Sequence, residues 1–246
     1  MNIINVEHLY KIYGEKIIFD DASFGIQKGD KIGIVGINGT GKSTLLKMIA
    51  GEETPDKGQI IKQNGLNLAY VPQNPVFSED STIRSYALKK GEENWKVESN
   101  LTELNITRFD QKIEHLSGGQ KKRVVLAKIL SDDFDVLLLD EPTNHLDEAM
   151  IRWLEEYLRS YKGTVIMVTH DRYFLDRVTN RILEISHGKM YGYDSDYSGF
   201  LELKAQREEM ESASERKRQS VLRMELEWAK RGGRARTCLL YTSPSP

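Results

Sequence analysis

The sequence of 246 residues contains one cysteine, Cys238, so it holds no partner for an internal disulfide bond and no cysteine-based zinc cluster. No apolar run approaches the roughly 18 residues that a membrane-spanning helix requires. The N-terminus lacks the basic segment and the apolar stretch of a secretory signal. We therefore expect a soluble, intracellular protein that is not a complete membrane transporter by itself.

The chain also lacks an excess of either charge. It has 35 Lys and Arg against 37 Asp and Glu, a formal net charge of −2, which argues against a globally basic nucleic-acid binder but leaves room for a local basic patch. Hydrophobic residues make up 39% of the chain, enough for a sizeable core, so wholesale disorder is excluded.

Short apolar runs alternate with helical patterns along most of the chain. The first 30 residues read as antiparallel strands with a turn at Gly14, and the stretch from about Thr82 to Glu114 reads as polar and helical. Further strands are predicted at 31–35, 59–62, 68–71, 135–139 and 164–168, and helices at 43–50, 118–130, 146–161 and 171–178. This order predicts an α/β fold with a mostly parallel sheet covered on both faces and a smaller antiparallel sheet beside it.

Residues 201–236 differ in composition and predict a long charged helix that ends at Gly232-Gly233. Its segment 216–236 has eight basic and two acidic residues, a net charge of +6. Apolar side chains fall on one stripe of this helix, at Val221, Met224 and Trp228. The last ten residues, 237–246, lose all charge and become rich in Ser and Pro; they are either a flexible native terminus or, as we favour because the change is abrupt, a non-native end.

A glycine-rich loop lies between the strand at 31–35 and the helix at 43–50. It fits G-x-x-x-x-G-K-[ST], and the predicted phosphate-binding residues are Gly36, Ile37, Asn38, Gly39, Thr40, Gly41, Lys42, Ser43 and Thr44. Glycines let backbone N–H groups approach phosphate oxygens, and the helix N-terminus favours an anion. We expect Lys42 to reach the β- and γ-phosphates and Ser43 to bind Mg²⁺. The alternative is an ordinary glycine-rich turn with a stray lysine.

Two acidic residues follow an apolar strand at 136–139. Asp140 leaves the strand at its carboxyl end, where parallel sheets bind ligands, and is expected to hold Mg²⁺ through its water shell. Glu141 is expected to orient or deprotonate the attacking water. The alternative is that two acids simply end a strand.

A third motif precedes the helix at 118–130. Ser117 is a plausible N-cap, and the glycines after it expose free N–H groups. The motif consists of Leu116, Ser117, Gly118, Gly119 and Gln120. Alone it would read as an ordinary capped helix start.

Together these motifs resemble the ATP-binding cassette family over about residues 3–200, and residues 116–120 match its signature loop. The resemblance also implies that Gln73 is the glutamine-loop residue, His170 the switch histidine and Tyr13 the aromatic that lies against adenine. Each has an alternative: a plain turn residue, a solvated strand end and an ordinary strand aromatic. The implied fold is a P-loop NTPase nucleotide-binding domain with a small antiparallel β-subdomain and a helical subdomain, followed by the long charged helix.

The segment from Glu141 to Asp147 is similar to that of the F subfamily, whose members carry two cassettes on one chain and no membrane domain. That resemblance implies a cytoplasmic protein that acts on ribosomes, with ribosomal RNA and tRNA as partners, in translation or antibiotic resistance. It makes Asp147 the residue of the D-loop. It also implies the domain limits: a nucleotide-binding domain at 1–200 with its helical subdomain at 82–131, the start of an interdomain linker at 201–236, and a tail at 237–246.

The family mechanism implied here is hydrolysis of ATP with Mg²⁺. Gln73 and Asp140 attend both Mg²⁺ and the attacking water, and Ser43 also binds the metal. Glu141 activates the water, and His170 contacts the γ-phosphate. The signature loop completes the site of the opposite cassette, so the expected partner is a second cassette, either a missing half or a second copy of the chain. The sequence has only one phosphate loop and one signature loop, and its stretch between Gln73 and Ser117 is short and lacks the arm insertion of some members.

Two other functions share these motifs. One is the ATPase subunit of a membrane transporter, which would give no reason for a basic helical linker. The other is a nucleotide-dependent binding module without hydrolysis, against which the presence of Glu141 and His170 argues.

Overall fold

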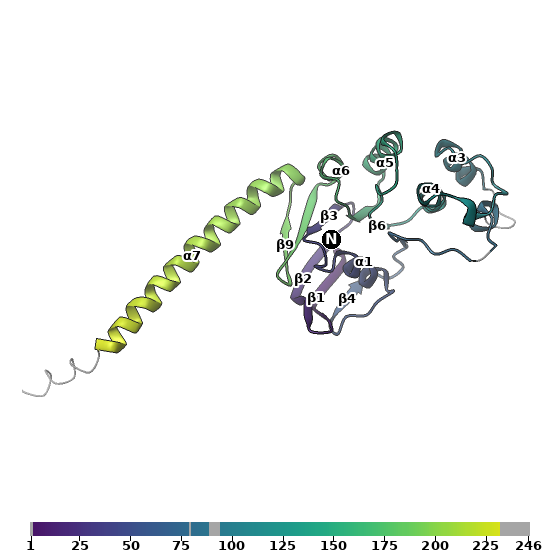
Figure 1. The fold of residues 1–246 in the computed structure, drawn as a ribbon. Coiled ribbons are helices and arrows are strands. Elements are labelled where there is room, and N and C mark those ends of the chain that lie inside the picture. The colour runs from purple at the N-terminus through teal and green to yellow at the C-terminus, as the bar shows by residue number, and fades with distance from the viewer. Residues whose placement is uncertain (1, 79, 89–93, 232–246) are drawn as a thin grey trace, which may run out of the picture. The chain divides into compact units, whose positions relative to one another are not determined.

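The computed structural model describes residues 2–78, 80–88 and 94–231. The chain divides into two units, residues 1–200 and 201–246, and each is described by itself. Figure 1 shows the elements of the first unit as a mixture of strands and helices, and α7 as one long helix.

The small antiparallel sheet has the strand order β2-β1-β4. It consists of β1 (Asn2–Tyr13), β2 (Lys16–Gln27) and β4 (Lys57–Lys62). The apolar alternation of β1 breaks between Val6 and Leu9, where the register of β1 against β2 shifts. His8 has a left-handed backbone there, with φ of 50°. The turn at Gly14 lies where the sequence predicts it.

The large sheet has six strands in the order β5-β6-β7-β3-β8-β9. They are β5 (Leu68–Val71), β6 (Val136–Asp140), β7 (Thr164–Val168), β3 (Lys31–Gly36), β8 (Arg181–Ser186) and β9 (Lys189–Tyr193). All neighbours pair parallel except β8 with β9. The mostly parallel sheet is confirmed, whereas the hairpin of β8 and β9 is an addition that the sequence analysis did not predict.

The two central strands β6 and β7 are buried along their whole length, which explains why they read as continuous apolar runs. Alternate residues face opposite sides of the sheet. Leu137, Leu139, Val165 and Met167 join one apolar cluster, and Val136, Leu138, Ile166 and Val168 join another. The sheet is therefore covered on both faces, as predicted.

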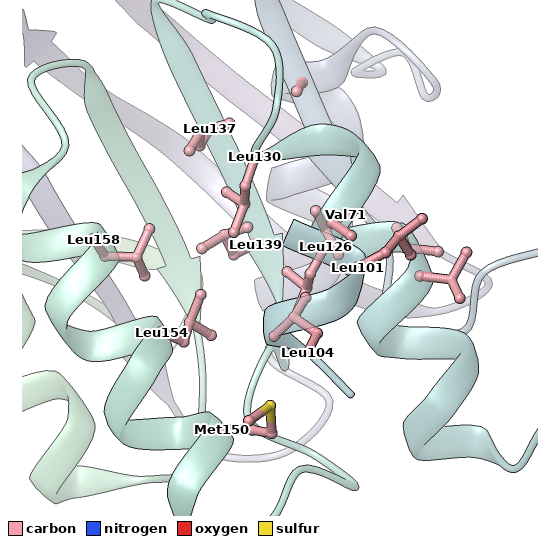
Figure 2. Close-up of a cluster of buried hydrophobic side chains, with 14 of the residues drawn as sticks. Val71, Leu101, Leu104, Leu126, Leu130, Leu137, Leu139, Met150, Leu154 and Leu158 are labelled. Carbon is pink, nitrogen blue, oxygen red and sulfur yellow. The ribbon is translucent and has the colours of Figure 1, made fainter. Parts of the chain in front are cut away.

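The first cluster packs helices α4 (Gly118–Ile129), α5 (Glu148–Ser160) and α6 (Arg172–Val178) on one face of the sheet. In Figure 2, Leu126 of α4 and Leu154 of α5 lie on either side of Leu139 in β6. The second cluster joins α1 (Lys42–Ala50) to the strands of the small sheet. These layers fix the ends of β3, β6 and β7, where the polar motifs begin.

The stretch from Thr82 to Glu114 is less helical than the sequence predicts. It contains α2 (Ile83–Ala87), α3 (Trp95–Glu103) and the short 3₁₀ helix η1 (Ile113–His115). The prediction is wrong for residues 104–112, which form no helix. Asn105 has φ of 59°, a left-handed conformation that a continuing helix does not allow.

The long helix α7 (Tyr197–Arg231) begins four residues before the predicted start at 201. Asp196 accepts a hydrogen bond from the backbone N–H of Gly199 at 2.9 Å and so stabilises the first turn. The predicted helix end at Gly232-Gly233 and the tail 237–246 lie outside the described residues.

Candidate nucleotide site

A cavity of about 430 Å³ lies at the carboxyl end of the central strands of the large sheet. Its walls come from β1, β2, the loop and helix after β3, the end of β7, and the segments after β5, β6 and β7. The lining residues are Tyr13, Ile18, Asn38, Gly39, Gly41, Lys42, Ser43, Thr44, Gln73, Glu141, Asn144, Val168 and His170. The structure thus brings Tyr13, Gln73, Glu141 and His170 to the glycine-rich loop, as the resemblance implies. Gly36, Ile37, Thr40 and Asp140 do not line the cavity.

The glycine-rich loop needs glycine where it meets the helix. Gly41 has φ of 97°, and a Cβ atom there would lie 2.2 Å from Cγ2 of Ile18. Only glycine tolerates both the left-handed backbone and this close approach. Two side-chain hydrogen bonds hold the loop. The Thr40 hydroxyl donates to the Ile37 carbonyl at 2.8 Å, and Nζ of Lys16 donates to the Gly39 carbonyl at 2.8 Å.

Lys42 is a buried cation at the first turn of α1. Its Nζ donates to the carbonyl oxygens of Gly36 at 2.9 Å and Ile37 at 3.2 Å. Burial lowers the pKa of Lys42, and the nearby carboxylates Glu141 and Asp140 partly oppose that shift. The ammonium group therefore lies inside the loop, where an anion would compensate for its lost hydration.

Asp140 is buried and linked to the loop helix through Ser43. The Ser43 hydroxyl donates to Oδ1 of Asp140 at 3.0 Å, and the Tyr70 hydroxyl lies 3.4 Å from Oδ2. Burial raises the pKa of Asp140, and the hydrogen bond from Ser43 acts against that shift.

The oxygen atoms of Asp140 and Ser43 show whether the implied Mg²⁺ would fit here. Carboxylate, hydroxyl and amide oxygens are its preferred protein ligands, and phosphate oxygens of a substrate usually complete its shell. No group of three or more His, Cys, Asp and Glu side chains able to hold a metal occurs in the described part of the chain. Asp140, Ser43 and the nearby Gln73 therefore fit a magnesium ion shared with phosphate, and do not fit a site made by the protein alone.

Glu141 follows β6 in a left-handed backbone conformation, with φ of 49°. Its N–H donates to the Val168 carbonyl at 2.8 Å, and its Oε1 lies 3.4 Å from Nε2 of His170. Its other oxygen, Oε2, is buried without a hydrogen-bond partner among the described residues. Burial raises the pKa of Glu141, while the charge of His170 opposes the shift. A buried carboxylate oxygen with free acceptor capacity at the cavity is suited to hold a water molecule.

The signature loop does not line this cavity. Ser117 caps α4 in a capping box: its hydroxyl accepts from the N–H of Gln120 at 3.3 Å, and the Gln120 side chain accepts from the N–H of Ser117 at 3.0 Å. A Cβ on Gly119 would lie 2.4 Å from the carbonyl oxygen of His145, whereas a Cβ on Gly118 would meet only open space.

Asp147 also lies outside the cavity lining. Its Oδ1 accepts from the N–H of Met150 and caps α5, and its Oδ2 lies 2.5 Å from Nη2 of Arg123. The residue assigned to the D-loop is therefore tied to α4, the helix that follows the signature loop, rather than to the cavity.

Sequence analysis missed Lys122 on α4. It is only 3% exposed, and its Nζ donates to the carbonyls of Pro72 at 3.0 Å, Gln73 at 3.4 Å and Asp140 at 3.1 Å. Burial lowers the pKa of Lys122 to about 8, against the opposing charges of Asp140 and Glu141. Its position three and four residues before Val125 and Leu126 puts it on the apolar face of the helix, a signal that could have identified it.

The basic segment of α7 is exposed as far as its side chains are described. Arg216, Lys217, Arg218 and Arg223 are exposed. Val221 and Met224 of the predicted apolar stripe are exposed as well, at 42% and 63%. The side chains of Trp228, Lys230 and Arg231 lie outside what is described, as do residues Arg234 and Arg236. In residues 2–78, 80–88 and 94–231, no helix combines the length and apolar character needed to cross a membrane.

Comparison with known proteins agrees with this geometry. A family model described as ABC transporter matches residues 19–144, and a second one with the same description matches residues 183–238. The chain is 42% identical to the uncharacterized ABC transporter ATP-binding protein YfmR of Bacillus subtilis, over 96% of this chain and 44% of that protein. It is 35% and 38% identical to the energy-dependent translational throttle proteins EttA of Mycobacterium tuberculosis (strain H37Rv) and Haemophilus influenzae, over 95% and 89% of this chain and 50% and 47% of theirs.

The chain thus spans about half the length of the curated relatives it matches. The alignment with YfmR runs over 280 positions, more than this chain has residues, so part of that relative has no counterpart here.

Solved structures share the fold. One titled as the ATP binding subunit of an ABC transporter superposes with a TM-score of 0.70 at 24% identity, over 78% of this chain and 90% of that one. A putative metal-chelate type ABC transporter in an inward-facing conformation gives 0.63 at 25%, over 79% and 84%. These likenesses support the P-loop nucleotide-binding fold. The chain therefore belongs to the ABC transporter family of ATP-binding proteins, and its similarity to the translational throttle proteins supports the F subfamily within it.

Proposed function

We propose that this chain binds ATP with Mg²⁺ in the cavity and hydrolyses the β–γ phosphate bond. One observation carries the proposal: a single cavity gathers Tyr13, Lys42, Gln73, Glu141 and His170 from five separate segments of the chain. Membership of the family supports nucleotide binding and ATP hydrolysis in general. The assignment of each residue is part of the proposal.

The loop of residues 36–44 holds the phosphates through its backbone N–H groups and Lys42. Ser43, Asp140 and Gln73 would hold Mg²⁺, which neutralises charge on the phosphate oxygens. Glu141 accepts a proton from the attacking water through its unpartnered Oε2, and His170 contacts the γ-phosphate. Tyr13 stacks on adenine.

Calorimetric titration with ATP and Mg²⁺ tests the site. Lys42→Ala removes the buried cation and is expected to weaken binding by roughly 10- to 100-fold, the usual value of a hydrogen bond to a charged group. Lys28→Ala, an exposed lysine in the turn before β3, is the control and should bind as the parent does. Equal affinity of the parent and Lys42→Ala would contradict the proposal.

We further propose that Leu116–Gln120 and Asp147 act on the nucleotide of a second cassette, either another part of a longer protein or a second copy of this chain. Their position outside the cavity lining and the open space at Gly118 support this. In this scheme residues 1–200 are the cassette, 82–131 its helical subdomain and 201–236 the start of a linker; residues 237–246 are a tail outside it.

The third part of the proposal is that the chain acts on ribosomes in the cytoplasm, with ribosomal RNA and tRNA as partners. Two relatives are named translational throttle proteins, and residues 216–236 carry a net charge of +6 in a chain of −2. Lys and Arg contacts to RNA phosphates release counterions, so binding should weaken steeply as salt rises. Deleting residues 216–236 should abolish cosedimentation with ribosomes at low salt and leave ATP affinity unchanged. Equal sedimentation with and without the segment would contradict it.

Resemblance to the F subfamily implies a role either in translation or in antibiotic resistance. If resistance is the role here, the parent but not Glu141→Gln should protect translation from a ribosome-binding antibiotic.

A transporter ATPase subunit is the second candidate, because the matching family model and the solved structures are described as ABC transporters. It predicts that the chain fractionates with membrane vesicles and not with ribosomes.

A further inference from the structure

Lys11 is a buried lysine on β1, two residues before Tyr13, with a side chain only 10% exposed. Its Nζ donates to the Thr54 carbonyl at 2.8 Å and lies 3.2 Å from Oε1 of Glu53 and 3.5 Å from Oδ1 of Asp56. A lysine has three donors, and all three have an oxygen nearby. Burial disfavours the charged form, but the hydrogen bond to Glu53 and the charges of Asp56 and Glu53 outweigh it and raise the pKa of Lys11.

Glu53 joins Lys11 to Tyr13. Its Oε1, the atom that faces Lys11, also accepts the hydrogen bond of the Tyr13 hydroxyl. Nζ of Lys11 in turn lies over the Tyr13 ring, 5.4 Å from its centroid, within range of a cation–π interaction. The tyrosine is therefore held at its hydroxyl and at one face of its ring, although the residue is 47% exposed to solvent.

The backbone around Tyr13 is tied to the same loop. The N–H of Ile12 donates to Oδ2 of Asp56 at 2.7 Å, and the N–H of Asp56 donates to the Tyr10 carbonyl at 2.9 Å. This loop directly follows α1, whose first turn carries Lys42 and Ser43. The contacts thus fix the end of β1 against the end of the helix that begins at the phosphate loop.

We propose that Lys11 and Glu53 are positioning residues for the nucleotide base, and that they hold the ring of Tyr13 ready to stack on it. The inference rests on the proposed ATP site. Ordering an exposed aromatic side chain on binding costs free energy, and a ring that is already held avoids that cost. Lys11 and Glu53 act through Tyr13 and touch neither phosphate nor metal, so their effect is confined to ligands that carry a base.

The test compares two ligands, ATP and inorganic triphosphate, each titrated with Mg²⁺ by calorimetry. Lys11→Met keeps the length of the side chain and removes the charge. It should weaken ATP binding by roughly 2- to 10-fold, the value of one ordered side chain, and leave triphosphate binding unchanged. Glu53→Gln is the milder variant, expected to act in the same direction and to retain the fold. Lys57→Met, an exposed lysine at the first position of β4, is the matched control.

A double-mutant cycle with Tyr13→Ala separates positioning from a general structural role. In the Tyr13→Ala background, Lys11→Met should cost no further ATP affinity. Equal weakening of ATP and triphosphate, or an undiminished effect in that background, would overturn the inference. If the parent binds ATP and both variants bind it equally well, this inference alone falls; if the parent binds no ATP, the proposed function falls with it.

Discussion

The cavity and the signature loop of this chain satisfy their polar groups in different ways. Lys42 and Glu141 in the cavity lining, and Asp140 behind it, are buried with shifted pKa values, and one oxygen of Glu141 has no partner among the described residues. In the signature loop, Ser117 and Gln120 satisfy each other's backbone. Farther along α4, Nη2 of Arg123 pairs with Asp147 at 2.5 Å, while its Nε is buried without a partner among the described residues. The cavity thus holds a buried acceptor that a ligand or water could use, whereas the backbone groups at the start of α4 are already paired.

That difference supports our proposal that the cavity binds this chain's own nucleotide, whereas the signature loop acts on the nucleotide of a second cassette. Buried polar groups without full compensation cost stability, and they occur where a ligand or a reaction makes use of them. A capped helix start with an open glycine costs nothing by itself and becomes useful when another surface meets it. One chain would thus supply parts of two nucleotide sites and close neither alone.

The largest expected effect concerns the cavity. Glu141→Gln keeps the size of the side chain and removes the base, so hydrolysis should fall by roughly 10²- to 10⁴-fold while ATP still binds. Phosphate release and ATP titration measure the two quantities. Glu148→Gln, an exposed glutamate in a surface pair with Arg152, is the control and should hydrolyse ATP as the parent does. Normal hydrolysis by Glu141→Gln would contradict the role of Glu141 as the base that activates the water.

A smaller effect should follow at the boundary between the two regions, from Lys122→Met. Three carbonyls, including those of Gln73 and Asp140, lose their donor, so the groups around the cavity become less well placed. We expect hydrolysis to fall by roughly 10-fold. Because a buried charge is removed at the same time, the free energy of unfolding should drop by only about 1 kcal/mol. Lys122→Arg should recover most of the activity; if it is as impaired as Lys122→Met, the donors are not what matters.

Much of the fold and of the cavity could be predicted from the sequence, because hydrophobic periodicity and short motifs depend on residues that are neighbours in the chain. The continuous apolar runs of β6 and β7, the glycine-rich loop and the capping box at Ser117 each depend on neighbouring residues. What could not be predicted depends on packing. The contacts of Lys122 with three distant carbonyls and the contact of Glu53 with Tyr13 form only once the sheets are stacked. The left-handed turn at Asn105 ended α3 where composition alone favoured continued helix.

The smallest effect is on stability and has a defined pH dependence. Burial raises the pKa of Glu141, so the folded chain favours the protonated acid; that contribution is present at low pH and is lost as pH rises through the raised value. At neutral pH the ionised side chain therefore costs stability, and Glu141→Gln should be more stable than the parent by about 0.5–2 kcal/mol. Urea unfolding without nucleotide should show the difference at pH 7.5 and a smaller one near pH 4. A less stable variant at neutral pH would contradict the cost assigned to this buried carboxylate.

The division between cavity and signature loop is tested most directly by mixing two inactive variants. Lys42→Ala retains the signature loop and loses the phosphate site, whereas Ser117→Ala retains the phosphate site and loses the hydroxyl of the signature loop. In an equal mixture of symmetric dimers, half of the pairs would contain both variants, and each such pair would hold one complete site. The account predicts that hydrolysis returns to about one quarter of the parent rate in the mixture. Activity no higher than the mean of the two separate variants would contradict it.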